Sequence, residues 1–226
     1  MQPGARGRRP DPDAWGPGYG APVPARRRTT ALAPRTADGG IGSALGAGIG
    51  FTVLTWVAFF VNQIFFFGPD NLNQRFGLRP LDPQGLWGIL FAPFLHADMQ
   101  HLMANTVPAA LFAALIAFTS KKLWLQVTAV VMVVSGAATW FIGGIGTAHV
   151  GASGLVYGWL AFLIVRGFYN RAPGQILLGM ILGFGYSGLI WGVFPTEIGV
   201  SWQMHLFGAI GGILAASMLK RGRAGR

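Results

Sequence analysis

The chain of 226 residues is 52% hydrophobic and only 11% charged, whereas a soluble domain usually carries about 25% charged residues, so the composition predicts a membrane protein with several spans and short loops. Cysteine is absent, which excludes disulfides, thiolate metal ligands and cysteine nucleophiles. The net charge of +10 comes from basic residues in the N-terminal segment and at the ends of apolar segments, which leaves no folded basic surface and argues against nucleic-acid binding.

Residues 1–42 are rich in Pro, Gly, Ala and Arg and show no apolar period. Such a segment buries too little apolar surface to offset its ordering entropy, so we expect a disordered basic tail. It is also too polar and too rich in proline to be a cleaved signal peptide.

Six apolar segments follow and predict an all-α bundle of six transmembrane helices over residues 43–219, with a short basic tail at 220–226. Most of them approach or exceed the roughly 20 residues that a helix needs to cross a bilayer. The segments run approximately over 43–67, 102–119, 123–143, 152–170, 174–194 and 202–219.

The distribution of basic residues predicts the orientation of these spans. With both termini in the cytoplasm, fifteen of the seventeen Lys and Arg residues lie inside, and only Arg75 and Arg79 lie outside. This asymmetry follows the positive-inside rule and favours cytoplasmic termini. The ratio of 14 Arg to 3 Lys is typical of a GC-rich bacterium, which would place the protein in a bacterial plasma membrane, although a eukaryotic organelle stays open.

The only long connection covers residues 68–101 and contains a cluster of apolar side chains. We expect this loop to dip into the bilayer interface, with Trp87 as an anchor.

The fourth segment opens with Gly151-Ala152-Ser153-Gly154. A serine at the start of a helix is often an N-cap, and this reading stays open for Ser153. The flanking glycines would instead allow a substrate or another helix to approach the serine closely, which favours a nucleophile.

The sixth segment contains His205, followed by Gly208 and Gly212 on the same helical face. Glycines at this spacing let membrane helices pack closely, and Gly154 and Gly158 repeat the spacing in the fourth segment. If these two faces pack together, Ser153 and His205 meet near the outer end of the bundle. A histidine that merely bridges two helices is the alternative.

The second segment carries His101 and Asn105, four residues apart and therefore on one helical face. Their hydrogen-bond donors could stabilise the oxyanion of an acyl-transfer intermediate. Metal binding is the alternative, because His96, Asp98 and His101 lie close together in sequence, but the arrangement HExxH is absent.

Two further residues accompany the serine. Tyr157 lies four residues after Ser153 and could pack beneath His205 and orient its ring, or simply fill space between helices. His149 could line the entrance of the site, but a solvated loop residue is its ordinary interpretation.

Over roughly residues 86–218 the chain resembles the rhomboid family of intramembrane serine proteases. His96 also matches a histidine often found in that family. The motifs that carry the resemblance are His101-x-x-x-Asn105, Gly151-x-Ser153-Gly154 and His205-x-x-Gly208-x-x-x-Gly212, in the second, fourth and sixth segments.

The resemblance implies a Ser–His dyad with Ser153 as nucleophile and His205 as general base, and no cofactor or metal. His101, Asn105 and the Ser153 N–H would form the oxyanion hole, Gly151 would support it, and Tyr157 would support the histidine. The substrates would be transmembrane segments of other membrane proteins, which would enter past the fifth segment acting as a lateral gate. The loop 195–201 would cover the site.

The chain departs from the family at two places. Gly88 follows Trp87 where many members have arginine, which we expect to loosen the first loop, and Met204 precedes His205 where a small residue is common.

Two other function classes compete with the protease. A rhomboid-like protein could bind membrane proteins without cutting them, as a quality-control adaptor, although such relatives usually lack the serine or the histidine. A transporter is disfavoured because no Asp or Glu lies inside a predicted span. The sequence leaves the oligomeric state open.

Overall fold

The computed structural model describes residues 38–220, and within this range the protein consists of helices joined by turns, with no β-strand. The predicted all-α fold is therefore confirmed. The predicted tails lie outside the described residues, apart from 38–42 and Lys220, and the first helix already begins at Ile41. The long helices are α1 (Ile41–Phe65), α4 (Met99–Thr119), α5 (Lys121–Ile142), α6 (Ser153–Asn170), α7 (Pro173–Gly185) and α8 (Trp202–Met218).

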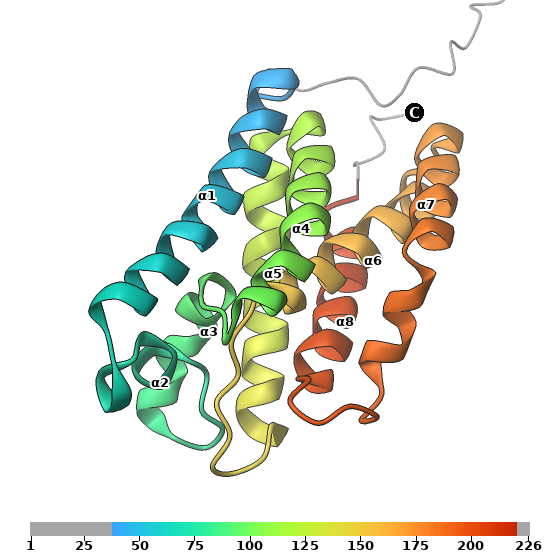
Figure 1. The fold of residues 1–226 in the computed structure, drawn as a ribbon. Coiled ribbons are helices and arrows are strands. Elements are labelled where there is room, and N and C mark those ends of the chain that lie inside the picture. Colours follow the sequence, from blue (N-terminus) through green and yellow to red (C-terminus); the bar gives the residue numbers. More distant parts are fainter. Residues whose placement is uncertain (1–37, 221–226) are drawn as a thin grey trace, which may run out of the picture.

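Helix α6 lies at the centre of the bundle (Figure 1). It packs against α4, α5, α7 and α8, while α1 lies along α4 on the outside. Its side chains form the middle of the apolar core, where Leu155, Trp159 and Leu163 are almost completely buried. A residue at the start of α6 is therefore surrounded by helices on several sides.

Hydrogen-bonding side chains fix the starts of three long helices, as expected for N-caps. The Asp98 carboxylate accepts from the His101 N–H at 2.8 Å, so α4 begins at Met99, three residues earlier than predicted. Ser120 caps α5 by accepting from the Leu123 N–H at 3.1 Å, and Ser201 caps α8 by accepting from the Met204 N–H at 3.4 Å.

Three of the described helices, α1, α4 and α5, are long and apolar enough to cross a membrane. The number rises to four if α7 and the 3₁₀ helix η4 (Ser187–Val193), which meet at a bend of 69°, form one broken span. Helix α8 has only 17 residues, and α6 contains Arg166. The count of six spans accordingly stays a prediction.

The first long connection contains short helices rather than an irregular loop. Its apolar side chains Trp87, Leu90 and Phe91 are exposed, so their insertion into the bilayer interface stays a prediction. A side chain at Gly88 would collide with the backbone of Leu78, so the glycine allows this close approach, while a loosened first loop stays a prediction. The short helices are η1 (Gly68–Asp70), α2 (Leu72–Phe76), η2 (Pro83–Trp87), α3 (Gly88–Phe91) and η3 (Ala92–Phe94).

Candidate active site

Ser153 is the first residue of α6, and its hydroxyl oxygen lies 2.8 Å from Nε2 of His205 in α8. The helix is preceded by Ala152 as N-cap, without a capping side-chain hydrogen bond. The N-cap interpretation of Ser153 is therefore wrong, and the hydroxyl instead joins two helices that are far apart in sequence.

The hydrogen bonds of His205 define its tautomer. Nδ1 lies 2.8 Å from the carbonyl oxygen of Gly192, which can only accept a hydrogen bond, so Nδ1 carries the proton. In the neutral ring Nε2 then has a free lone pair and accepts the hydrogen bond of the Ser153 hydroxyl. This is the tautomer that a general base needs in order to take a proton from a serine.

Tyr157 lies one turn after Ser153, and its ring stacks on the His205 imidazole with centroids 4.2 Å apart. Its hydroxyl donates to the carbonyl oxygen of Leu189 at 2.7 Å. A side chain at Gly192 would collide with the Tyr157 hydroxyl, so the glycine lets η4 approach both rings. The prediction that Tyr157 packs against His205 is confirmed.

The predicted glycine faces of α6 and α8 do pack against each other. A methyl group at Gly208 would collide with the carbonyl oxygen of Gly154, and one at Gly212 would collide with that of Gly158. These contacts bring the two helix backbones together one and two turns away from the Ser153–His205 pair. The close approach explains how two short side chains on separate helices come within hydrogen-bond distance.

Of the predicted oxyanion residues, His101 lies against the segment that precedes Ser153. Gly151 has a φ of +121°, and a side chain there would collide with the His101 ring, so the glycine allows the imidazole to lie against the backbone before Ser153. Asn105 is buried and donates from Nδ2 to the carbonyl oxygen of His101 at 3.0 Å, which uses one of its two amide hydrogens. The structure therefore brings His101 and Gly151 into contact and places Asn105 one turn further along α4.

His96 lies behind this arrangement, fully buried, with its ring at 5.1 Å from that of His101. Its Nε2 faces the N–H of Ala152 at 3.4 Å. Burial, and next to it the neighbouring His101, lowers the pKa of His96 to about 4, so the ring is neutral at physiological pH. The Asp98 carboxylate caps α4, and no cluster of three His, Cys, Asp or Glu residues that could hold a metal occurs among residues 38–220.

His149 differs from its ordinary interpretation as a solvated loop residue. Only 8% of its surface is exposed, and both ring nitrogens have hydrogen-bond partners. Burial lowers the pKa of this histidine. The sequence offers one weak signal that His149 lies near the site, because it precedes Ser153 by only four residues.

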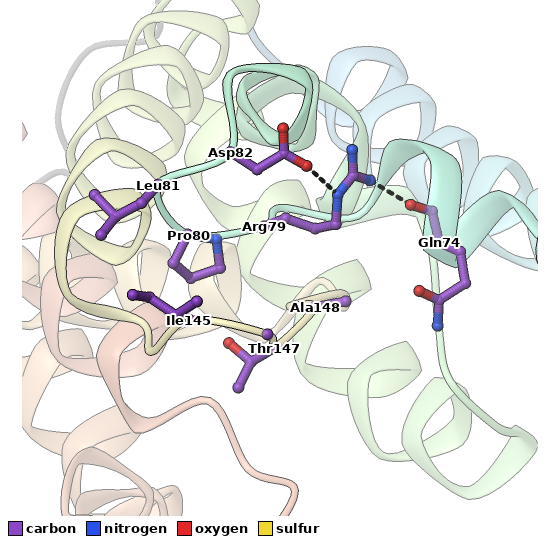
Figure 2. A pocket seen from close by; sticks show the side chains of 9 residues that line it. Gln74, Arg79, Pro80, Leu81, Asp82, Ile145, Thr147 and Ala148 are labelled. Atoms are coloured by element: carbon purple, nitrogen blue, oxygen red, sulfur yellow. Dashed lines mark hydrogen bonds and ion pairs between the residues drawn. The ribbon is translucent and has the colours of Figure 1, made fainter.

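A cavity of about 370 Å³ lies beside the connection between α5 and α6, bordered on its other side by the first long connection (Figure 2). Figure 2 shows the Arg79 side chain between Asp82 and Gln74 at the border of this cavity. The Arg79 side chain, which donates to Asp82 at 2.7 Å, lowers the pKa of that carboxyl. None of the residues that line this cavity belongs to the Ser153–His205 pair.

Sequence reasoning missed the carbonyl groups of Leu189 and Gly192. Both come from η4, and both hold a ring of the site through a backbone oxygen. Every residue has such an oxygen, so no side-chain pattern could have indicated them.

Apolar helices around a serine hydroxyl bonded to a histidine define an integral membrane protein with a Ser–His pair inside a helical bundle. The model of the rhomboid domain matches residues 83–222, and the chain therefore belongs to the rhomboid family.

The chain is also similar to curated bacterial proteins, one of which carries the family in its name. The chain is 42% identical over 180 residues to "Uncharacterized protein Rv1337" of Mycobacterium tuberculosis (strain ATCC 25618 / H37Rv), an alignment that covers 75% of each chain. It is 44% identical over 180 residues to "Uncharacterized protein ML1171" of Mycobacterium leprae (strain TN), which covers 75% of this chain and 71% of the relative. It is also 32% identical over 133 residues to "Putative rhomboid protease YdcA" of Bacillus subtilis (strain 168), covering 58% of this chain and 66% of the relative.

Proposed function

We propose that the protein is an intramembrane serine endopeptidase that cleaves transmembrane segments of other membrane proteins. The observation that carries this proposal is the hydrogen bond of 2.8 Å between Ser153 Oγ and His205 Nε2, in a ring whose other nitrogen is held by the Gly192 carbonyl. The bacterial relatives support a place in a bacterial plasma membrane, and the charge distribution supports cytoplasmic termini.

The reaction follows from this geometry. His205 Nε2 takes the hydroxyl proton while Ser153 Oγ attacks the carbonyl carbon of the scissile peptide bond. The imidazolium that forms keeps its Nδ1–H on the Gly192 carbonyl, which takes the orienting position that a carboxylate occupies in a Ser-His-Asp triad. His205 then gives the proton to the leaving amine, and a water molecule activated by the same ring releases the acyl group.

The negative oxygen of the tetrahedral intermediate needs hydrogen-bond donors. We assign this role to the Ser153 N–H and to the side chains of His101 and Asn105, with Gly151 supporting the position of His101. The contact of the His101 ring with Gly151 and the remaining amide hydrogen of Asn105 support the assignment. In a dry site such donors contribute several kcal/mol to transition-state stabilisation.

A fluorophosphonate probe tests the proposal, since it reacts readily only with a serine that a base activates. The purified protein, in detergent and in liposomes, should be labelled at Ser153, and Ser153→Ala and His205→Ala should reduce labelling by about a thousandfold or more. Ser135→Ala is the matched control, because Ser135 is also buried in the bundle but donates to its own helix at the Val131 carbonyl. Absence of labelling in folded wild-type protein would reject the protease and favour a non-catalytic adaptor that binds membrane proteins.

A further inference from the structure

His149 is anchored to the first long connection through its backbone. The Leu78 N–H donates to the His149 carbonyl at 3.0 Å, and the His149 N–H donates to the Leu78 carbonyl at 2.8 Å. These two bonds hold the segment before Ser153 against residues that lie outside the central helices. The backbone at His149 is therefore held in place independently of α8.

The hydrogen bonds of the ring define its tautomer. Nε2 lies 3.2 Å from the Gly143 carbonyl, which only accepts, and 2.9 Å from the Thr147 hydroxyl, so Nε2 carries the proton. Nδ1 lies 2.6 Å from the Ser201 hydroxyl and, in the neutral ring that burial favours, must accept from it. The bond between His149 and Ser201 thus runs from the serine O–H to the histidine Nδ1.

Ser201 determines where α8 begins. Its hydroxyl caps the helix, and its carbonyl accepts the hydrogen bond of the His205 N–H at 3.2 Å, one turn further along. The loop 194–200 that leads to this turn is mostly exposed, and its described backbone hydrogen bonds are local, such as Thr196 N–H to Phe194 O and Val200 N–H to Glu197 O. The loop itself therefore offers little to hold the first turn of α8 in place.

Two Ser–His hydrogen bonds thus connect the same two segments. His149 pairs with Ser201, and four residues further along each segment Ser153 pairs with His205. We propose that His149 is a positioning residue, which holds the first turn of α8 through Ser201 and thereby sets His205 against Ser153. Its effect on reactivity rests on the proposed protease function, whereas its effect on α8 does not.

Three substitutions of His149 separate the two ring nitrogens. An asparagine amide reaches about as far as Nδ1 and can accept from Ser201, whereas a glutamine amide reaches about as far as Nε2 and replaces only the bonds to Thr147 and Gly143. We expect His149→Asn to keep labelling of Ser153 within about threefold of the wild type, and His149→Gln and His149→Phe to slow it by about 10- to 100-fold, because small displacements of a general base have effects of this size. All three substitutions change a buried side chain, so a lower Tm is expected for each variant and does not by itself distinguish them.

Two substitutions of Ser201 complete the test. Ser201→Thr retains the hydroxyl and should be labelled at the wild-type rate. Ser201→Ala should be labelled as slowly as His149→Gln. Ser217→Ala is the control, since Ser217 is a partly exposed serine at the other end of α8 that donates within its own helix.

Hydrogen–deuterium exchange of the peptide that contains residues 201–207 gives a readout independent of catalysis. The amides of the first turn of α8 should exchange faster in His149→Gln and Ser201→Ala than in the wild type, and at the wild-type rate in His149→Asn and Ser201→Thr. Equal exchange in the Asn and Gln variants would overturn the proposal. If the wild type is not labelled but the exchange pattern is as expected, the protease function is rejected, while the proposal that His149 holds the first turn of α8 is supported.

Discussion

The rings of Tyr157 and His205 lie parallel, with centroids 4.2 Å apart and an interplanar angle of 6°. The tyrosine hydroxyl and the histidine Nδ1 both donate to carbonyls of η4, at Leu189 and Gly192. The two rings are therefore fixed by their stacking and by the same short segment. Displacement of η4, which continues α7 after the bend of 69°, would break both hydrogen bonds together.

This arrangement predicts different effects for two substitutions of Tyr157. Tyr157→Phe keeps the stack and loses only the hydrogen bond to Leu189, so fluorophosphonate labelling of Ser153 should slow by up to about tenfold, the equivalent of one hydrogen bond. Tyr157→Ala also removes the surface on which His205 rests and should slow labelling by about 10- to 100-fold.

Tyr169→Ala is the control for these variants, because Tyr169 is an exposed tyrosine of the same helix near its other end. Labelling of Tyr157→Ala at the wild-type rate would contradict a supporting role for the stacked ring.

The glycine contacts between α6 and α8 predict a large effect of a small side chain. In Gly208→Val the new Cβ would meet the Gly154 carbonyl, which has no room to move because it belongs to the backbone of α6. The helices must separate, so we expect a lower Tm, by about 5–10 °C, and loss of labelling through the widened distance between Ser153 and His205.

Gly46→Val in α1 provides the comparison, since a Cβ at Gly46 meets no heavy atom within 4 Å. This variant should match the wild type in thermal unfolding and in labelling. If Gly208→Val unfolds at the same temperature as Gly46→Val, the close packing of α6 on α8 does not stabilise the protein.

Helical spacing explains which parts of the site could be predicted. Ser153 and Tyr157, like Gly208 and Gly212, are four residues apart in apolar segments, and this spacing alone places each pair on one helix face. The meeting of Ser153 with His205 followed from packing the glycine faces together, and the structure shows that contact.

Other features depend on tertiary contacts that a local pattern does not contain. The carbonyls of Leu189 and Gly192 have no side-chain signature, and His149 is buried by segments from three parts of the chain. The bend between α7 and η4 interrupts an apolar run that the sequence shows as continuous from 174 to 194. Hydropathy measures composition, so it does not reveal where such a run changes direction.

The buried His96 predicts a loss of stability in mild acid. The pKa of His96 is about 4 in the folded protein against an ordinary value of 6.5, so between these values the unfolded chain binds a proton that the folded chain does not. Stability should therefore fall as the pH falls from about 6.5 to about 4, by about 3 kcal/mol for this residue. The lowered pKa of His149 acts in the same direction.

Thermal unfolding in detergent between pH 4 and pH 8 measures this effect. His96→Gln can still accept from the Ala152 N–H but does not titrate, so its Tm should be less dependent on pH in this range, even if it is lower at neutral pH. The lowered pKa of Asp82 changes stability only below about pH 3.8, the ordinary value of this carboxyl, which lies below the pH range of the experiment. An equally steep acid loss in wild type and His96→Gln would assign the effect to other groups.

Cysteine accessibility can decide whether α6 and α8 cross the membrane, because the chain contains no cysteine of its own. Ile198→Cys and Lys220→Cys place exposed thiols before and after α8, and Ile145→Cys and Arg171→Cys do so for α6. With cytoplasmic termini, a membrane-impermeant maleimide should label positions 198 and 145 in right-side-out vesicles, and positions 220 and 171 only after permeabilisation.

Labelling of both thiols of a pair from the same side would show that the helix between them does not span the membrane. Labelling of position 220 with protection of position 198 would show the opposite orientation. The expected pattern for both pairs would place Ser153 and His205 at the outer end of the bundle, where water reaches the site from outside the cell.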